Sequence, residues 1–364
     1  MLQEAKGDKA GGSRDALADT LARLRASRAY RNYERTREHV FDMKDRARRR
    51  SGSDTPSRYW TFELSHIDYM IDASPIIIDK LRHHCHHLTG VRPFETHRTA
   101  KTEYLESFHF KIEKLYGLGP RELLVPESPI LGGFGHDVDG RLVNVDTLKY
   151  FEVALALERA GVLARLRAID RPVVCEIGPG WGGFAYTFKQ LFPTATMILV
   201  DLPELFLFSA TYLMTAFPEA HVAFWEDAGT AEALQSAAPP DFVFVSHTEI
   251  DEVRPPRLDA TINMVSFQEM RADQVRAYVN WAADHKSACL YSLNRDRSPY
   301  NDELVSVRDV MRERFDVRDI EMLPWNYAKF VHPRKLERKG LPKPSENDLG
   351  LDYCHAIGER LGNA

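Results

Sequence analysis

Apolar residues recur at helical spacing through the first third of the chain, as they do between Leu17 and Leu24. Ser13 stands just before this stripe and is suited to cap the helix that the spacing predicts. No segment of this part alternates apolar and polar residues as a half-buried strand does. We therefore expect a helical N-terminal region over residues 1–120, with residues 1–13 disordered.

Beyond residue 120, short apolar runs begin to alternate with helical spacing. The Asp139-Gly140 pair predicts a tight turn, and the pattern from Thr147 to Leu166 predicts a long amphipathic helix. Strands alternating with helices are typical of a mostly parallel, doubly wound sheet. The fold class that we expect over 121–333 is therefore α/β and Rossmann-like. The five apolar runs that predict its buried strands are 173–177, 196–200, 241–246, 260–265 and 288–293.

The end of the chain gives weaker patterns. Residues 318–332 have the composition of a closing pair of strands. Residues 334–364 begin with a basic, proline-rich stretch, which predicts an extended tail followed by a short helix near Cys354.

Charge and composition exclude several classes of protein. The 364 residues carry a formal net charge of −5, so the chain as a whole does not attract nucleic acid or an anionic membrane surface. No run of about 18 apolar residues is present, and the polar N-terminus lacks the apolar core of a signal peptide. The four cysteines are scattered, without metal-binding or redox spacing. We expect a cytoplasmic protein with no membrane, nucleic-acid or metal partner.

A glycine-rich segment, Glu176-Ile-Gly-Pro-Gly-Trp-Gly-Gly183, lies where the first predicted strand turns into a helix. Glycines let the backbone approach a ligand closely, and such folds bind nucleotides beyond the carboxyl ends of the strands. The spacing of Gly178, Gly180 and Gly183 also satisfies the dinucleotide pattern G-x-G-x-x-G. A nicotinamide-dependent oxidoreductase therefore stays an alternative, as does a plain strand–helix turn.

Two acidic residues favour S-adenosylmethionine over a dinucleotide. Glu176 precedes the first glycine by two residues, where its carboxylate can accept hydrogen bonds from the ammonium group of an amino acid. Asp201 ends the second predicted strand, where it can bind both ribose hydroxyls of an adenosine. Adenosine joined to an amino acid is S-adenosylmethionine, so we expect this cofactor and a methyltransferase activity.

Five blocks between about residues 120 and 295 carry a family resemblance: Glu127-Ser-Pro-Ile-Leu-Gly-Gly-Phe-Gly135, Asn144-Val-Asp-Thr-Leu-Lys-Tyr150, Glu176 to Gly183, Val200-Asp-Leu-Pro-Glu204 and Asn263-Met-Val-Ser-Phe-Gln-Glu-Met270. Through them the chain resembles a bacterial family of sugar O-methyltransferases. The resemblance implies the class I methyltransferase fold, S-adenosylmethionine, and a sugar or sugar-bearing small molecule of secondary metabolism as the methyl acceptor. The cofactor-binding residues that we expect are Glu176, Gly178, Pro179, Gly180, Gly182, Asp201, Leu202, Tyr150, Ser246, Asn263 and Ser266.

Proton removal from an acceptor hydroxyl calls for a general base near the transferred methyl group. Glu269 follows the fourth predicted strand, whose end faces that methyl group in this fold, and His247 follows the third. The alternatives are that Glu269 only starts the next helix and that His247 contacts adenine or is a simple loop histidine. His136, next to the Gly132–Gly135 loop, is the third candidate.

The acceptor pocket is the least determined part of the site. Gln268, Asp146 and Phe134 are candidate acceptor-binding residues, although Asp146 is better placed to cap the helix that starts at Thr147. The helical region is expected to cover the cofactor crevice as a lid, with some of its aromatic residues lining the pocket and most of them in the core. It also offers candidate contacts for a homo-oligomer.

The run His83-His84-Cys85-His86-His87 is a weak candidate for a metal site. On a helix His83 and His87 share a face, but no third ligand is evident from another segment. We favour histidines exposed at the end of a helix before Gly90, where the helix dipole stabilises their charged form.

O-methylation of a sugar or sugar-bearing small molecule is thus the predicted function. C- or N-methylation of a small aromatic natural product such as an indole is the nearest alternative. A non-catalytic protein that binds the cofactor is a third.

Overall fold

The computed structural model describes residues 7–50, 56–93, 96, 102–226, 228–297, 301, 303, 306–325, 327 and 353–361. Within these residues no helix has both the length and the apolar character needed to span a membrane. Three of the four cysteines are buried, and each of the four carries a free thiol.

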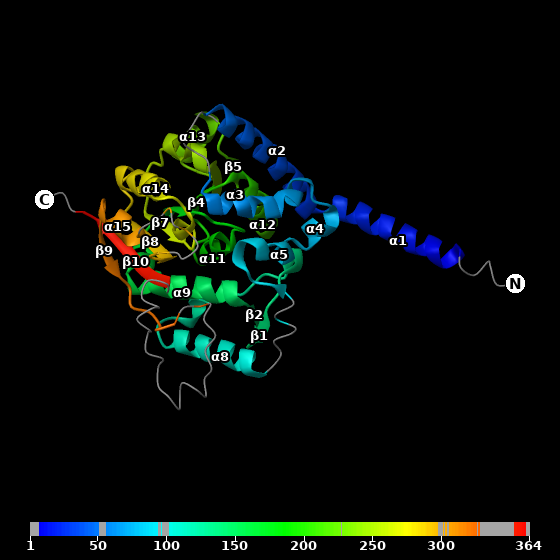
Figure 1. Cartoon of the computed structure of the whole chain (residues 1–364), viewed down its shortest axis with the longest axis horizontal. Coiled ribbons are helices and arrows are strands. Elements are labelled where there is room, and N and C mark those ends of the chain that lie inside the picture. Colours follow the sequence, from blue (N-terminus) through cyan, green and yellow to red (C-terminus); the bar gives the residue numbers. More distant parts are fainter. Residues whose placement is uncertain are drawn as a thin grey trace.

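The first third of the described chain is helical, as predicted. Its helix α1 begins at Gly7, so residues 7–13 are helical where the sequence predicts disorder. Figure 1 shows α1 projecting from the body of the molecule. The helices are α1 (Gly7–Arg25), α2 (Arg28–Arg49), α3 (Arg58–Ile67), the 3-10 helix η2 (Asp68–Asp72), α4 (Pro75–Asp79), α5 (Leu81–His84), α6 (His86–Thr89) and α8 (Thr102–Tyr116).

A short connecting section joins this region to the sheet. It contains the 3-10 helices η3 (Arg121–Leu123) and η4 (Ile130–Gly132) and a hairpin of β1 (His136–Val138) and β2 (Arg141–Val143), which is joined by the predicted tight turn. Both residues of the hairpin turn, Asp139 and Gly140, have positive φ, as a tight turn of this kind requires. The predicted long helix is divided at Gly161, whose φ is +74°, into α9 (Val145–Arg159) and α10 (Val162–Arg167).

All five predicted strands belong to one eight-stranded sheet. Its order is β5-β6-β4-β3-β7-β8-β10-β9, and the first six strands are parallel. This is a mostly parallel, doubly wound, Rossmann-like sheet, preceded by a helical region as expected. The strands are β3 (Val173–Ile177), β4 (Thr196–Asp201), β5 (Val222–Phe224), β6 (Phe242–Ser246), β7 (Ala260–Met264), β8 (Cys289–Arg295), β9 (Phe315–Asp319) and β10 (Tyr353–Arg360).

The C-terminal prediction was wrong. Where a short helix was expected near Cys354, the chain forms strand β10, which lies antiparallel between β8 and β9. The closing pair expected within 318–332 is instead β9 with β10, and residues 328–332 lie outside the described residues. The local sequence pattern could not predict this strand, because β10 pairs with strands more than 30 residues away in the sequence.

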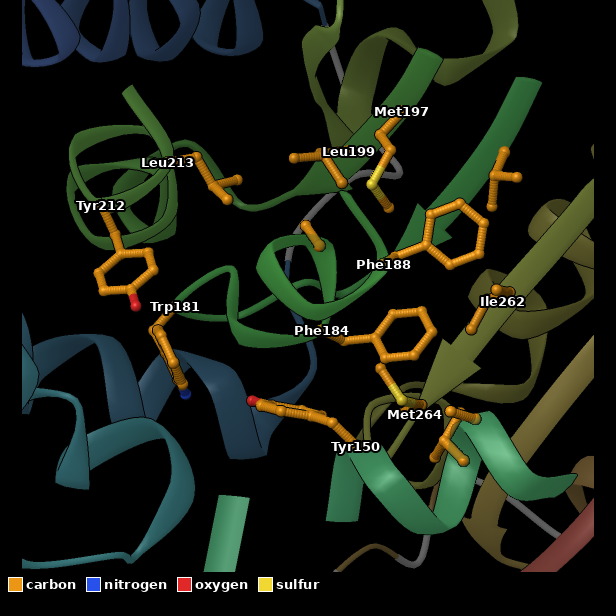
Figure 2. Packing of buried hydrophobic residues seen from close by; sticks show 14 of the residues in the cluster. Tyr150, Trp181, Phe184, Phe188, Met197, Leu199, Tyr212, Leu213, Ile262 and Met264 are labelled. Atoms are coloured by element: carbon orange, nitrogen blue, oxygen red, sulfur yellow. The ribbon is translucent and has the colours of Figure 1, made fainter. Parts of the chain in front are cut away.

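Helices cover both faces of the sheet. Alternate residues of β4 show the division, since Met197 and Leu199 pack with α9, α11 and α12, whereas Ile198 and Val200 pack with α13, α14 and α15. Figure 2 shows the first of these layers, with Phe184 and Phe188 of α11 set against the sheet. The covering elements are α11 (Gly183–Leu191), η5 (Pro203–Leu205), α12 (Phe206–Ala216), α13 (Ala228–Gln235), η6 (His247–Glu252), η7 (Phe267–Glu269), α14 (Ala272–Asp284) and α15 (Val307–Arg312).

The helical region packs directly onto these helices. α2 lies against α12 (Figure 1), and Asn32 donates a hydrogen bond to Thr215 across the contact at 3.1 Å. At the end of α2 the guanidinium of Arg46 pairs with buried Glu249 of η6 at 2.6 Å. The residues that α2 buries recur at helical spacing, namely Tyr33, Thr36, Val40 and Met43.

Candidate functional site

A cavity of about 430 Å³ lies beyond the carboxyl ends of the central strands. Segments that follow β3, β4, β6 and β7 form one part of its wall, and residues of α3, α6 and their flanks form another. In doubly wound folds this edge of the sheet is where ligands bind. The two regions of the molecule therefore meet at the candidate site.

The glycine-rich loop after β3 borders the open space of the cavity. Gly178 and Gly180 have φ of +72° and +57°, which residues with a side chain rarely adopt. A Cβ at Gly178 would lie 2.2 Å from the hydroxyl oxygen of Ser266, so no other residue fits there. A Cβ at Gly180 would meet no atom within 4 Å, which leaves its backbone accessible to a ligand.

Asp201 organises this loop from the end of β4. One carboxylate oxygen accepts a hydrogen bond from the amide of Gly180 at 3.0 Å, and the other accepts one from the amide of Leu202 at 2.8 Å. Burial raises the pKa of Asp201 to about 7, against the lowering effect of these two amides. A ligand that donates hydrogen bonds to this carboxylate would favour its charged form.

Glu176 is a buried carboxylate with no partner among the described residues. Its side chain is 1% exposed, it lines the cavity, and neither of its oxygens accepts a hydrogen bond. Burial raises the pKa of Glu176 to about 8, and the nearby carboxylate of Asp201 adds to the shift. A buried carboxylate is costly unless a donor or cation meets it, so the site is built for a positively charged group.

Three of the predicted cofactor residues act from behind the cavity wall. Asn263 donates hydrogen bonds to the carbonyl of Ile177 at 2.9 Å and to the hydroxyl of Ser266 at 2.5 Å, and thereby joins β3 to β7. Ser246 caps η6, and Gly182 lies against α12, so neither lines the cavity. The predicted residues that do line it are Tyr150, Glu176, Gly178, Pro179, Gly180, Asp201, Leu202 and Ser266.

The three candidate bases differ in whether they line the cavity. Glu269 and His247 both line the cavity, whereas His136 lies on β1 with its ring centroid 5.3 Å from that of Phe108 and does not line it. Burial raises the pKa of Glu269 to about 8, with the nearby carboxylate of Glu63 as the next cause. Glu269 is therefore poised to gain or lose a proton near neutral pH.

Of the candidate acceptor residues, Gln268 and Asp146 line the cavity and Phe134 does not. The cap expected of Asp146 belongs to Asn144, whose side chain accepts a hydrogen bond from the amide of Thr147 at 3.0 Å. Asp146 pairs instead with Arg82 at 3.3 Å, so its buried carboxylate serves an ion pair that the local sequence does not reveal.

Arg82 of α5 joins the helical region to the cofactor loop. It is fully buried, pairs with Glu127 at 2.6 Å, and stacks over the indole ring of Trp181 with 3.7 Å between the guanidinium carbon and the ring centroid. Phe134 contributes a second ring at 5.1 Å from that carbon. Figure 2 shows the indole nitrogen of Trp181 and the hydroxyl of Tyr150 pointing into the same space.

The acceptor-side wall contains two of the aromatic residues of the helical region, Tyr59 and Trp60, in agreement with the expectation that some of these aromatics line the pocket. Ser57 caps α3 and donates a hydrogen bond to the carbonyl of Glu269 at 2.6 Å, which fixes the first turn of α3 beside η7. Tyr59, Trp60 and Glu63 of α3 line the cavity as a result. Ser57 as a helix cap was the available signal, but only the folded chain places it at Glu269.

The histidine run does not form an exposed helix end. His83, His84, His86 and His87 are half-buried, and His84 hydrogen-bonds to the hydroxyl of Tyr69 at 2.8 Å. Burial lowers the pKa of His84 and of His87, which is opposite to the dipole effect expected there. Within the described part of the chain, no three histidine, cysteine or acidic side chains gather as metal ligands would.

Comparison with known proteins gives likenesses at the level of structure alone. No family model and no curated protein matches the chain. Among solved structures, the bifunctional kinase-methyltransferase WbdD matches with a TM-score of 0.38 and 13% identity over 68% of this chain and 46% of that chain. The chain thus spans less than half of WbdD.

Two further structures are matched over most of their own length. Magnesium protoporphyrin IX methyltransferase from Synechocystis PCC 6803, solved with bound SAM, gives a TM-score of 0.32 and 14% identity over 72% of this chain and 96% of that one. Precorrin-6y C5,15-methyltransferase from Geobacter metallireducens gives 0.33 and 12% over 56% and 87%. All three TM-scores lie below 0.5, so the function has to follow from the residues of the cavity.

Proposed function

We propose that this chain is an S-adenosylmethionine-dependent methyltransferase whose cofactor binds in the cavity at the strand ends. The observation that carries the proposal is Glu176, a buried carboxylate without a partner that lines the cavity beside the glycine-rich loop. The ammonium group of the cofactor's amino acid is the cation that this carboxylate lacks. Asp201 receives the ribose hydroxyls, and the open backbone at Gly180 lets the cofactor approach.

When bound, the cofactor supplies a methyl group on a sulfonium, already activated for transfer. The tasks of the protein are to align the acceptor, to exclude water and to take up a proton. Glu269 is the base that we favour, because it follows β7, whereas His247 follows β6 on the other side of β3, beyond Asp201. His247 then contacts the adenosine end.

The acceptor is a small molecule, and a sugar or sugar-bearing compound is the class that we propose. Polar groups able to bind hydroxyls are present on the wall, among them Gln268, Asn301 and Glu63. Tyr59 and Trp60 give flat apolar surfaces as well, which favours the second candidate function, C- or N-methylation of an aromatic compound. The helical region acts as the lid and selects the acceptor in either case.

Calorimetry with S-adenosylmethionine and with its demethylated product, S-adenosylhomocysteine, tests the proposal without an acceptor. Both should bind without added metal, and Glu176→Gln should weaken both about ten- to hundredfold because a charge-assisted hydrogen bond is lost. Glu34→Gln, an exposed glutamate of α2, is the matched control and should bind as the native chain does. Absence of binding at millimolar ligand, or tight binding of NADH instead, would overturn the proposal.

A further inference from the structure

Acidic side chains outnumber lysine and arginine side chains on the wall of the cavity. Among the residues that line it, the acidic ones are Glu63, Asp146, Glu176, Asp201 and Glu269, and the basic ones are Lys149 and Arg295. S-adenosylmethionine brings one net positive charge, from its sulfonium and ammonium groups less its carboxylate. Asp146 already pairs with Arg82 and Lys149, and the cofactor meets Glu176 and Asp201, so the two acids left over are Glu63 and Glu269.

Two of these carboxylates, Glu63 and Glu269, line the acceptor side of the cavity. The hydrogen bond from Ser57 to the carbonyl of Glu269 holds the start of α3 at η7. Tyr59 and Glu63 stand four residues apart on α3, so they share one face of the helix, and both line the cavity with Glu269. Glu63 is close enough to Glu269 to be the largest electrostatic influence on it.

Neither carboxylate is neutralised by a strong cation in the part of the chain described. Glu63 has only His66, at 3.8 Å, and Glu269 has a hydrogen bond with Gln268. The two basic residues of the wall have other close partners, although Lys149 also lowers the pKa of Glu269 and Arg295 that of Tyr59 through their charges. Lys149 pairs with Asp146 at 3.5 Å, and Arg295 lies over the ring of Tyr353 at 4.9 Å.

Aromatic rings flank the pair. Tyr59 and Trp60 meet edge to face with 5.8 Å between their centroids, and Tyr278 and Tyr353 also line the cavity. Carboxylates together with aromatic faces are the surroundings that organic cations prefer, because the ring face is electrostatically negative.

We propose that the methyl acceptor carries a cationic nitrogen, which binds between Glu63 and Glu269 against the rings of Tyr59 and Trp60. The inference rests on the proposed function and narrows its acceptor to compounds with an aliphatic amino group, such as amino sugars or aromatic ring systems that bear an aminoalkyl chain. Glu63 holds the ammonium group as an ion pair. The arriving positive charge also favours the ionised form of Glu269, which then has a free carboxylate to accept the proton that the acceptor loses.

Proton release distinguishes this arrangement from a purely structural role of the two acids. The pKa of Glu269 is raised to about 8 in the free protein, so near pH 7 most molecules carry the proton. Glu63 and Asp201 raise this pKa, and Lys149 lowers it. A cation bound beside Glu269 adds to the lowering effect, and the proton leaves to the buffer.

The experiment uses the full-length protein saturated with S-adenosylhomocysteine and matched pairs of probes. The pairs are glucosamine with N-acetylglucosamine and tryptamine with N-acetyltryptamine, titrated by calorimetry at pH 7 in phosphate and in Tris. At least one amine should bind about ten- to hundredfold more tightly than its acetylated partner. Its apparent enthalpy should differ between the two buffers because a proton is released.

Glu63→Gln is the diagnostic variant. It should remove the preference for the amine while leaving the affinity for S-adenosylhomocysteine unchanged, and Glu34→Gln should change neither. If the acetylated probes bind as well as the amines, if no probe binds to the saturated protein, or if Glu63→Gln keeps the preference, the inference is wrong. Failure of the proposed function is a different result, because S-adenosylhomocysteine itself would then not bind.

Discussion

The two halves of the cavity differ in how the chain builds them. The cofactor half comes from the ends of strands and the short segments that follow them, such as Glu176 to Gly183 at the end of β3 and Asp201 at the end of β4. The acceptor half comes from helices without a common motif, held by single contacts such as the one from Ser57 to Glu269. Site residues at strand ends can be recognised from a short stretch of sequence. A pocket formed by the packing of separate helices is evident only in the folded chain.

Substitution of the general base has the largest expected effect. It tests whether the residue that removes the proton is Glu269, after β7, or His247, after β6. Glu269→Gln should lower turnover about 10²–10⁴-fold, with affinity for S-adenosylhomocysteine nearly intact, because the acceptor keeps its proton. His247→Asn should instead weaken cofactor binding more than it lowers turnover. Steady-state kinetics with the amine acceptor, together with calorimetry of both variants, makes the comparison. The reverse pattern would assign the base to His247.

Arg82 links the helical region to the cofactor loop, and its substitution should give the next largest effect. Arg82→Met leaves the buried carboxylates of Glu127 and Asp146 without their shared cation, which should cost about 3–5 kcal/mol in the free energy of unfolding. Arg48→Met, which removes an exposed ion pair with Asp45, should cost about 0–1 kcal/mol. Urea unfolding measures both. Equal shifts would mean that the helical region is only loosely attached.

Asp201 tests the cofactor half by itself. Asp201→Ala removes the acceptor of the Gly180 and Leu202 amides together with the partner of the ribose hydroxyls, and cofactor affinity should fall about ten- to hundredfold. Asp316→Ala, on the exposed side of β9, is the control and should bind normally. Calorimetry with S-adenosylhomocysteine measures both variants. Equal affinity in the two would remove Asp201 from the site.

The same contrast explains what the sequence could predict. Strand β3 was predicted with its observed bounds, and Glu176, Gly180 and Asp201 line the cavity, because an apolar run, glycines and an acid at a strand end follow one another in the chain. Asp146 was taken for a helix cap because its partner Arg82 lies 64 residues away. Strand β10 was missed for the same reason, since its partners β8 and β9 are remote in sequence.

The predicted region limits, 1–120, 121–333 and 334–364, stay a proposal. Interleaved packing complicates them, since Arg46 and Arg82 of the helical region both pair with buried acids of the remainder. Contacts between copies of the chain through the helical region are also still a prediction.

The smallest expected effect, and the one that most sharpens the comparison, is the pH dependence of cofactor binding. In the free protein the pKa of Glu176 is about 8 and that of Asp201 about 7, and both groups have to be ionised in the complex. Binding should therefore weaken as the pH falls, by about tenfold between pH 8 and pH 7, of which proton uptake by Glu176 gives about fivefold and proton uptake by Asp201 about twofold. Above pH 8 the gain should end, because the amino group of the ligand loses its own charge near that pH.

Stability should show the matching sign. Folding raises the pKa of Glu176. In the cofactor-free protein its contribution to the free energy of unfolding is therefore fully present below the ordinary carboxyl pKa and is lost as the pH rises through about 8. With S-adenosylhomocysteine bound, the loss should disappear because the ammonium group meets the ionised carboxylate. Glu176→Gln should reduce the pH dependence of affinity between pH 7 and 8 from about tenfold to the roughly twofold change that Asp201 gives, while Glu63→Gln, on the acceptor side, should leave it in place. If Glu63→Gln flattens it instead, the proton taken up belongs to the acceptor half, and the division of the cavity into a cofactor side and an acceptor side is wrong.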